Sequence, residues 1–235
     1  MGAIYKRELK SYFTSPVAYI FLGVVYIFSG IFLFSLNLVY AIVDIPMIIE
    51  QMFYIVIYIL PLITMRMLSE DRKNKTDQAL LTAPVSTIAI VLGKYFAALT
   101  VYFISCLIYI VYAVVFSLYS ALMWGTVFTS FLGLFLAGAA IIAIGMFISG
   151  LTESLIVSAL GSFGVSIFLS LVSSVAYLVN NEFVSKLADS ISFYEKFSVF
   201  VQGQLDLSYI LFFLSVIALF IYYSAHSIDR RRYVA

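Results

Sequence analysis

The sequence predicts an all-α polytopic membrane protein with six transmembrane helices, and three observations support this fold class. Of the 235 residues, 64% are hydrophobic and 11% are charged, against about 45–50% and about 25% in an ordinary soluble domain. The apolar residues fall in long stretches, and crossing a bilayer takes roughly 20 residues. The basic residues gather beside those stretches. This composition excludes soluble, disordered, fibrous and nucleic-acid-binding proteins, because the net charge of +1 also provides no basic field for nucleic acid.

The spans follow from the stretches that lack Asp, Glu, Lys and Arg. The longest, residues 95–152, is too long for one span and must fold as two, with a turn near residues 120–126. The stretch 51–65 is short, so we expect Glu50 and Arg66 near the two interfaces, with Arg66 extending outward and Pro61 kinking the helix. The single predicted domain, 1–235, divides into an interfacial helix (4–15), six spans (17–40, 50–68, 88–119, 126–149, 154–179 and 207–228), a cytoplasmic connection (69–86) and outer interfacial helices (180–206).

The distribution of basic residues predicts the orientation. With both termini in the cytoplasm, 11 of the 13 Lys and Arg residues lie on the inner side, and only Lys186 and Lys196 lie outside. The positive-inside rule therefore favours a multi-pass protein with both termini cytoplasmic.

Residues 4–15 form an amphipathic segment ahead of the first span. Lys6, Arg7 and Lys10 are placed to reach lipid headgroups, while the apolar side chains on the segment are placed to face lipid. The apolar positions are Ile4, Leu9, Tyr12 and Phe13. We predict an interfacial helix, and the alternative is a charged flank that only sets the topology.

The connection 69–86 carries the densest cluster of charges. Ser69 followed by Glu70 and Asp71 is typical of a helix start, because acidic groups complement the positive end of the helix dipole. Thr76 offers a second start, and Pro84 ends the helix. A short helix with exposed leucines between charges suits docking to a cytosolic partner, whereas the alternative is an ordinary solvated loop.

Three motifs resemble those of ABC-2 type transporter permeases. Residues 68–86, LSEDRKNKTDQALLTAPVS, followed by Leu92-Gly-Lys94, resemble the signature of that family, with Lys75 where the family usually has Gly. Residues 7–20, RELKSYFTSPVAYI, and residues 192–206, SFYEKFSVFVQGQLD, resemble the subgroup of gliding-motility and nitrous-oxide-reductase maturation permeases. The resemblance runs from end to end of the chain.

The resemblance implies a fold like that of type V exporters and a half-transporter in a prokaryotic cell membrane. Two permease chains, identical or related, would pair in the membrane above a separate ATPase subunit that binds ATP and Mg. Residues 76–84 would be the coupling helix, and residues 150–154 a smaller contact. The residues implied in ATPase coupling are Glu70, Asp71, Arg72, Thr76, Leu80, Leu81, Pro84 and Glu153. This chain has no phosphate-binding G-x-x-x-x-G-K-[ST] loop, since Ile88 stands five residues before Gly93, so we expect no ATPase site.

Small and polar residues mark the predicted membrane interior. Serine recurs at every fourth position of the fifth span, and a four-residue step drifts by about 40° around a helix. The serines either line a pathway at a dimer interface or allow tight packing. The candidates are Ser158, Ser162, Ser166 and Ser170. Small residues at four-residue spacing in the fourth span, such as Gly145 and Ser149, predict close packing.

The sequence contains no catalytic constellation and no metal-binding cluster that we could identify. The leading hypothesis is the permease subunit of an ABC-2 exporter. An ion-coupled secondary transporter is one alternative, although no charged residue stands clearly in mid-membrane. A non-transporting membrane scaffold of an ABC-type complex is another.

Overall fold

The computed structural model describes residues 1–39, 44–76, 86–178 and 182–232, and these residues form helices and short connections without any β-strand. Six helical segments are long and apolar enough to cross a membrane, which confirms the predicted fold class. The segments are Pro16–Asn37, Ile45–Lys73, Thr87–Ser117, Trp124–Leu151, Leu155–Ala176 and Leu207–Arg230.

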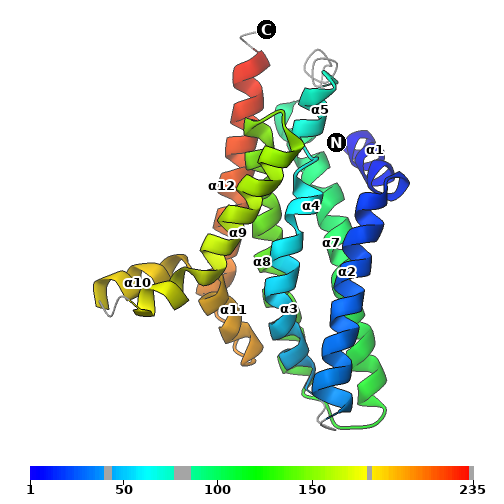
Figure 1. Cartoon of the computed structure of the whole chain (residues 1–235), viewed down its shortest axis with the longest axis vertical. Coiled ribbons are helices and arrows are strands. Elements are labelled where there is room, and N and C mark those ends of the chain that lie inside the picture. Colours follow the sequence, from blue (N-terminus) through cyan, green and yellow to red (C-terminus); the bar gives the residue numbers. More distant parts are fainter. Residues whose placement is uncertain (40–43, 77–85, 179–181, 233–235) are drawn as a thin grey trace.

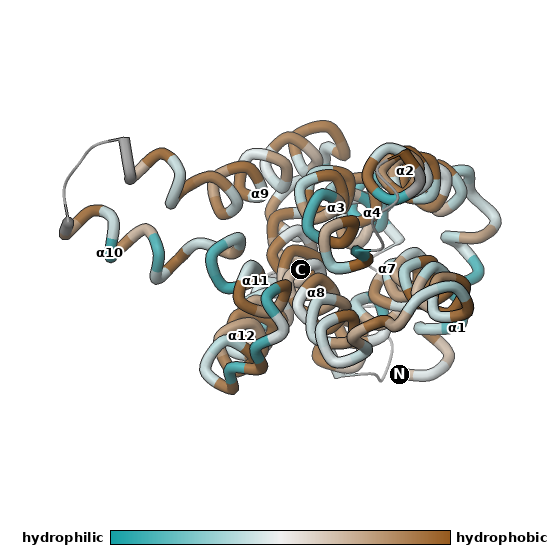
Figure 2. Tube along the Cα trace, turned by 90° about the horizontal axis from the view of Figure 1, so that it is seen from below, coloured by the Kyte–Doolittle hydropathy of each residue, from teal (hydrophilic) through white to brown (hydrophobic). Residues whose placement is uncertain are grey.

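The central helix is α8 (Trp124–Leu151), which is the most buried of the six spans. Other helices surround it when the molecule is viewed along its long axis (Figure 2). Gly, Ala and Ser recur on all sides of α8, and such small side chains let neighbouring backbones approach closely. The other bundle helices are α2 (Pro16–Phe32), continued by the π-helix η1 (Leu33–Leu38), α3 (Ile45–Ile59), α7 (Thr87–Ser117), α9 (Leu155–Leu178) and α12 (Leu207–Arg232).

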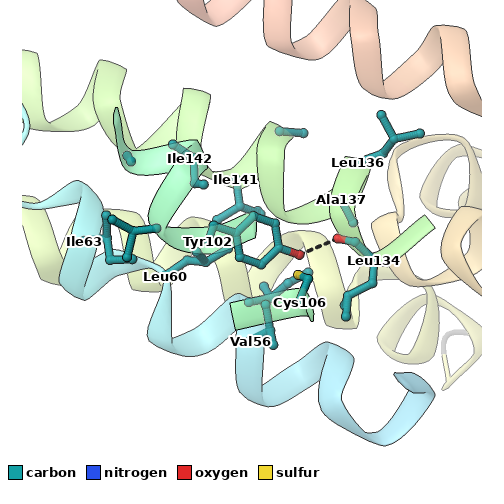
Figure 3. Packing of buried hydrophobic residues seen from close by; sticks show 14 of the residues in the cluster. Val56, Leu60, Ile63, Tyr102, Cys106, Leu134, Leu136, Ala137, Ile141 and Ile142 are labelled. Carbon is teal, nitrogen blue, oxygen red and sulfur yellow. Dashed lines mark hydrogen bonds between the residues drawn. The ribbon is translucent and has the colours of Figure 1, made fainter. Parts of the chain in front are cut away.

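Glycines of α8 are the points where neighbouring helices come closest. Gly138 lies against the Tyr102 ring of α7, and the Tyr102 hydroxyl donates a 2.6 Å hydrogen bond to the Leu134 carbonyl (Figure 3). Gly145 lies against Thr64 in the same way. Packing is thus the role of these small residues, as their spacing predicts.

Replacement of Gly138 by Ala is expected to destabilise the bundle. The added methyl group would overlap the ring of Tyr102, which is fully buried and has no space to withdraw. Overpacking of this kind costs about 1–3 kcal/mol. Thermal unfolding in mild detergent measures the effect. Gly23→Ala is the matched control, because nothing lies within 4 Å of the added atom; a similar loss in both variants would contradict the packing argument.

The N-terminal helix and the last described turn of α12 lie toward the same end of the bundle (Figure 1). The described segments at this end carry the Lys and Arg positions other than Lys186 and Lys196, and we call it the basic end. The opposite end carries the turn between α7 and α8 (Figure 1). The basic residues therefore gather toward one end of the spans, and the orientation of that end in the membrane stays a prediction.

The second span departs from its predicted bounds. α3 begins well before residue 50, because the Asp44 carboxylate accepts a 3.0 Å hydrogen bond from a backbone N–H of the first turn and caps the helix. Glu50 therefore lies inside the helix, where it accepts a 2.9 Å hydrogen bond from the Tyr194 hydroxyl. The helix breaks at Pro61 and continues as the short α4 (Pro61–Thr64).

The N-terminal helix α1 (Gly2–Thr14) packs on α7 and α2. Its apolar face does not point to lipid as expected. Tyr12 is buried and donates a 3.2 Å hydrogen bond to the Ile63 carbonyl, and Ile4 lies close to Gly93 of α7. The apolar side chains of α1 instead join the core of the bundle. Lys6 and Lys10 are exposed, in keeping with the expected contact to headgroups, which stays a prediction.

The outer segment forms two helices, α10 (Glu182–Ile191) and α11 (Phe193–Val201). α10 projects sideways from the bundle (Figure 1). Lys196 of α11 fastens the end of α10, because its ammonium donates to three carbonyl oxygens and lies 4.3 Å from the centre of the Phe212 ring. The carbonyls belong to Asp189 at 2.9 Å, Ser190 at 2.7 Å and Ser192 at 3.4 Å.

The serines of α9 face the interior of the chain. Ser158, Ser162, Ser166 and Ser170 are at most 2% exposed, and Ser170 shares a 3.1 Å hydrogen bond with the Tyr58 hydroxyl of α3. At the two ends of the series the serines are exposed, as the predicted drift around the helix requires. This position favours tight packing within one chain, and a pathway role stays a prediction.

Candidate functional site

The candidate site is built around α5 (Ser69–Lys73), the short helix that precedes residues 77–85. Glu70 and Asp71 lie in its first turn, and Arg72 and Lys73 in its last. This order complements the helix dipole at both ends. The sequence correctly predicts where α5 begins, but not what holds it there.

Ser149 of α8 caps α5, although Ser69 was the expected start signal. The Ser149 hydroxyl accepts hydrogen bonds from the N–H groups of Leu68 (3.1 Å) and Ser69 (3.0 Å) and donates to the Met65 carbonyl (3.1 Å). The Ser69 hydroxyl donates to that same carbonyl instead of capping the helix. One buried hydroxyl therefore ties the second span to the fourth.

Replacement of Ser149 by Ala should loosen this junction. Two buried N–H groups would lose their acceptor, and a buried unsatisfied polar group costs about 1–3 kcal/mol. We expect a lower melting temperature and faster hydrogen exchange in α5. Ser215→Ala is the control, since the exposed Ser215 hydroxyl bonds only within its own helix in the described structure. Equal exchange rates in the two variants would rule out the capping role.

A buried ionic cluster joins α5 to α1 and α7. Lys94 of α7, whose side chain is 3% exposed, lies 2.6 Å from an Asp71 carboxylate oxygen and 3.1 Å from a Glu8 carboxylate oxygen. Arg7 completes the cluster, 2.5 Å from Glu8 and 3.9 Å from Asp71. We call Arg7, Glu8, Asp71 and Lys94 the Lys94 cluster. It brings together residues from three elements that are far apart in the sequence.

The charges of the Lys94 cluster balance, two positive against two negative. Such balance matters because a charge that leaves water must be paired to be tolerated. The hydrogen bond to Glu8 raises the pKa of Arg7, and partial burial opposes the rise. Arg7 thus turns toward the cluster with half of its side chain exposed, rather than reaching only for lipid headgroups as expected.

Arg72 connects α5 to the end of α8. Its guanidinium donates to the Gly150 carbonyl at 3.1 Å and to the Glu153 carboxylate at 3.2 Å. Arg72 and Glu153 are predicted coupling residues from separate segments, and the structure brings them together. Glu153 is 69% exposed, so this ion pair adds little stability by itself.

Arg66 holds the segment before α5 in place and does not extend outward as expected. Its guanidinium makes two 2.8 Å hydrogen bonds to the Glu70 carboxylate and a third, at 2.9 Å, to the Ser15 hydroxyl. Ser15 lies between α1 and α2, so this group joins the first and second spans. A paired guanidinium with partly buried partners forms a stable joint.

The chain turns at Lys75, which has a φ of 56°. This left-handed conformation favours glycine, the residue common at this position in the family that the sequence resembles. Lys75 therefore follows the backbone path of a glycine. Thr76 steadies the turn by donating a 2.8 Å hydrogen bond to Asp71. The predicted coupling residues Leu80, Leu81 and Pro84 lie outside the described residues.

Sequence reasoning missed the roles of Glu8, Lys94, Arg66 and Ser149. Glu8 and Lys94 belong to two of the motifs that resemble the ABC-2 permeases, at residues 7–20 and 92–94. Membership in those motifs is the sequence feature that could have indicated a role for them. Their pairing could not be inferred, because the partners lie in different segments of the sequence. Lys94 is 86 positions from Glu8 and 23 from Asp71, and Ser149 is 80 positions from Ser69.

The residues around α5 connect helices to one another. In the described ranges, His, Cys, Asp and Glu side chains form no group of three that could hold a metal ion. What α5 has are fixed connections to α1, α7 and α8. A force on residues 77–85 would therefore be passed to three parts of the bundle.

Comparison with known protein families identifies a match over most of the chain. The sequence model of a family described as "ABC-2 family transporter protein" matches residues 34–227, which includes Asp71, Lys94 and Ser149 but not α1. A search of the curated proteins found no match.

Proposed function

The chain belongs to the ABC-2 family of transporter proteins and is a membrane permease component of such a transporter. From this premise we propose that it serves an exporter driven by a separate ATPase subunit. ATP and Mg would bind to that partner. We further propose that the chain falls in the subgroup of gliding-motility and nitrous-oxide-reductase maturation permeases, from the motifs at residues 7–20 and 192–206.

The observation that carries the proposal is the triple anchoring of α5. The helix is tied to α7 and α1 through Lys94, and to α8 through Ser149 and Arg72. Closure of the ATPase dimer would push on residues 76–84, and α5 would pass this displacement to the spans. The transporter would then alternate between inward-open and outward-open states, or squeeze its substrate outward.

The orientation supports this arrangement. We propose that the basic end faces the cytoplasm of a prokaryote, because cytoplasmic loops carry an excess of Lys and Arg. The site around α5 would then lie on the side where ATP is available. A second permease chain, identical or related, would complete the membrane part.

The test begins with purification of the full chain in mild detergent to find which proteins accompany it. An ATPase subunit should co-purify, and a second permease would define the symmetry. Once the complex is reconstituted in vesicles, the ratio of ATP hydrolysis by the complex to hydrolysis by the free ATPase subunit reports coupling.

The decisive variant carries Leu80→Asp and Leu81→Asp. The variant should insert in the membrane normally. The ATPase subunit should then hydrolyse ATP at the same rate with this variant as it does alone. Leu118→Asp with Tyr119→Asp is the matched control, because this exposed pair lies at the opposite end. Unchanged coupling in the Leu80/Leu81 variant, or transport driven by an ion gradient without any ATPase, would overturn the proposal.

A further inference from the structure

A groove of about 330 Å³ opens between α8 and α12 at the basic end, apart from the site around α5. One wall is a stripe on α12, where residues 223, 226, 227 and 230 follow the spacing of a single helix face. The other wall is the last turn of α8, with Phe147 and Leu151. The volume is at the small end of the range for ligand sites and suits one small polar group.

The polar residues of the groove can all donate hydrogen bonds, and the guanidinium of Arg230 cannot accept one. Arg230 provides a guanidinium, Ser227 a hydroxyl and His226 an imidazole. No carboxylate is among the residues that line the groove. A set of donors around a permanent positive charge selects an oxyanion such as a phosphate.

The opposite side of the groove is aromatic and continues onto the surface of the bundle. The Phe147 and Tyr223 rings lie 6.0 Å apart and form the floor, and the Tyr222 ring stacks on the His226 imidazole at 6.2 Å. Tyr222 is 64% exposed, and exposed apolar residues continue along α12 toward the opposite end. A ligand here meets an apolar surface on one side and donors on the other.

The groove lies where charged residues first appear along both helices. α8 contains no charged residue, and Glu153 is the first after it; α12 contains none before Asp229. Both acids lie near the groove without lining it: Glu153 pairs with Arg72, and Asp229 is half-buried. This is the depth at which the hydrocarbon of a bilayer gives way to its headgroups.

We propose that the groove between α8 and α12 binds the phosphate of an anionic phospholipid headgroup. Arg230 and Ser227 contact the phosphate, His226 donates to a neighbouring headgroup oxygen, and the acyl chains run along the exposed apolar face of α12. Basic pockets between helices at the cytoplasmic surface are known to hold such headgroups. The aromatic floor favours a lipid over a soluble anion or an acidic partner protein.

The test measures lipid preference directly. The full chain is placed in nanodiscs with equal amounts of phosphatidylglycerol and phosphatidylcholine, released, and analysed by native mass spectrometry. We expect retained phosphatidylglycerol to exceed phosphatidylcholine. Arg230→Gln with Ser227→Ala should reduce this preference about fivefold or more, since one basic residue near a membrane surface contributes about that factor.

The control is Lys10→Gln, which removes one exposed charge at the same end of the bundle. Equal preference in the two variants would overturn the proposal, because general surface charge would then explain the binding. Competition by inorganic phosphate as strong as by phosphatidylglycerol would assign the site to a soluble anion. Loss of a co-purifying ATPase with lipid preference intact would assign it to a protein partner.

Discussion

Replacement of Lys94 by Met is expected to give the largest loss of stability and of coupling. The substitution keeps the apolar stem and removes the charge, so Asp71 and Glu8 would remain partly buried without their common partner. Removing one partner of a buried ion pair costs about 3–5 kcal/mol. Thermal unfolding in detergent gives the stability, and ATP hydrolysis by the reconstituted complex gives the coupling.

A second variant separates coupling from folding. The triple change Lys94→Met, Glu8→Gln and Asp71→Asn removes the three charges that are mostly buried and leaves Arg7, whose side chain is half exposed to water. Replacing a buried ion pair as a whole is often close to neutral for stability. We expect this variant to fold. The complex built with it should hydrolyse ATP only at the rate of the free ATPase subunit. Normal coupling in the triple variant would show that the Lys94 cluster serves stability alone.

Replacement of Lys196 by Met should free α10 from α11. Lys196 is 7% exposed, and its ammonium is the shared donor to three carbonyl oxygens at and just after the end of α10. Burial lowers the pKa of Lys196, while the carboxylates of Asp189 and Glu195 oppose the change and favour the charged form. Because hydrogen bonds to a charged group are worth about 1.5–3 kcal/mol, we expect a loss of about 3 kcal/mol.

Hydrogen exchange measures this effect where it arises. Exchange in α10 should become faster in the Lys196→Met variant, while α7 and α8 keep the exchange of the parent chain. Lys6→Met is the control, since Lys6 is exposed on α1. If α10 exchanges at the same rate in both variants, contacts other than Lys196 hold it.

Local signals in the sequence predict the spans well. The charge-free stretches locate all six. Ser86 caps α7, since its hydroxyl accepts a 3.4 Å hydrogen bond from the Ala89 N–H, and serine is a preferred cap residue. Asp44 shows the limit of counting charges. A charge beside an apolar stretch suggests a boundary, whereas an acidic residue shortly before Pro46 is a common helix start.

The candidate site was predictable only in part, because its bonds join distant segments. Glu70, Asp71 and Arg72 could be nominated from one loop, and Glu153 from another. The cap from Ser149 joins positions about 80 residues apart, and neither periodicity nor propensity carries that information. The burial of Lys94 could not be predicted either, because a lysine next to a span is usually an exposed residue at the membrane interface.

The docking of α1 determines the order in which this protein is assembled. α1 is synthesised before the residues on which it docks, since its partners Ile63, Asp71, Lys94 and Thr100 follow it in the sequence. At about 5–20 residues per second, roughly 5 to 20 seconds separate the synthesis of Glu8 from that of Lys94. The N-terminal helix must therefore wait at the membrane surface until the third span has been made. Its docking is therefore a late event in biogenesis.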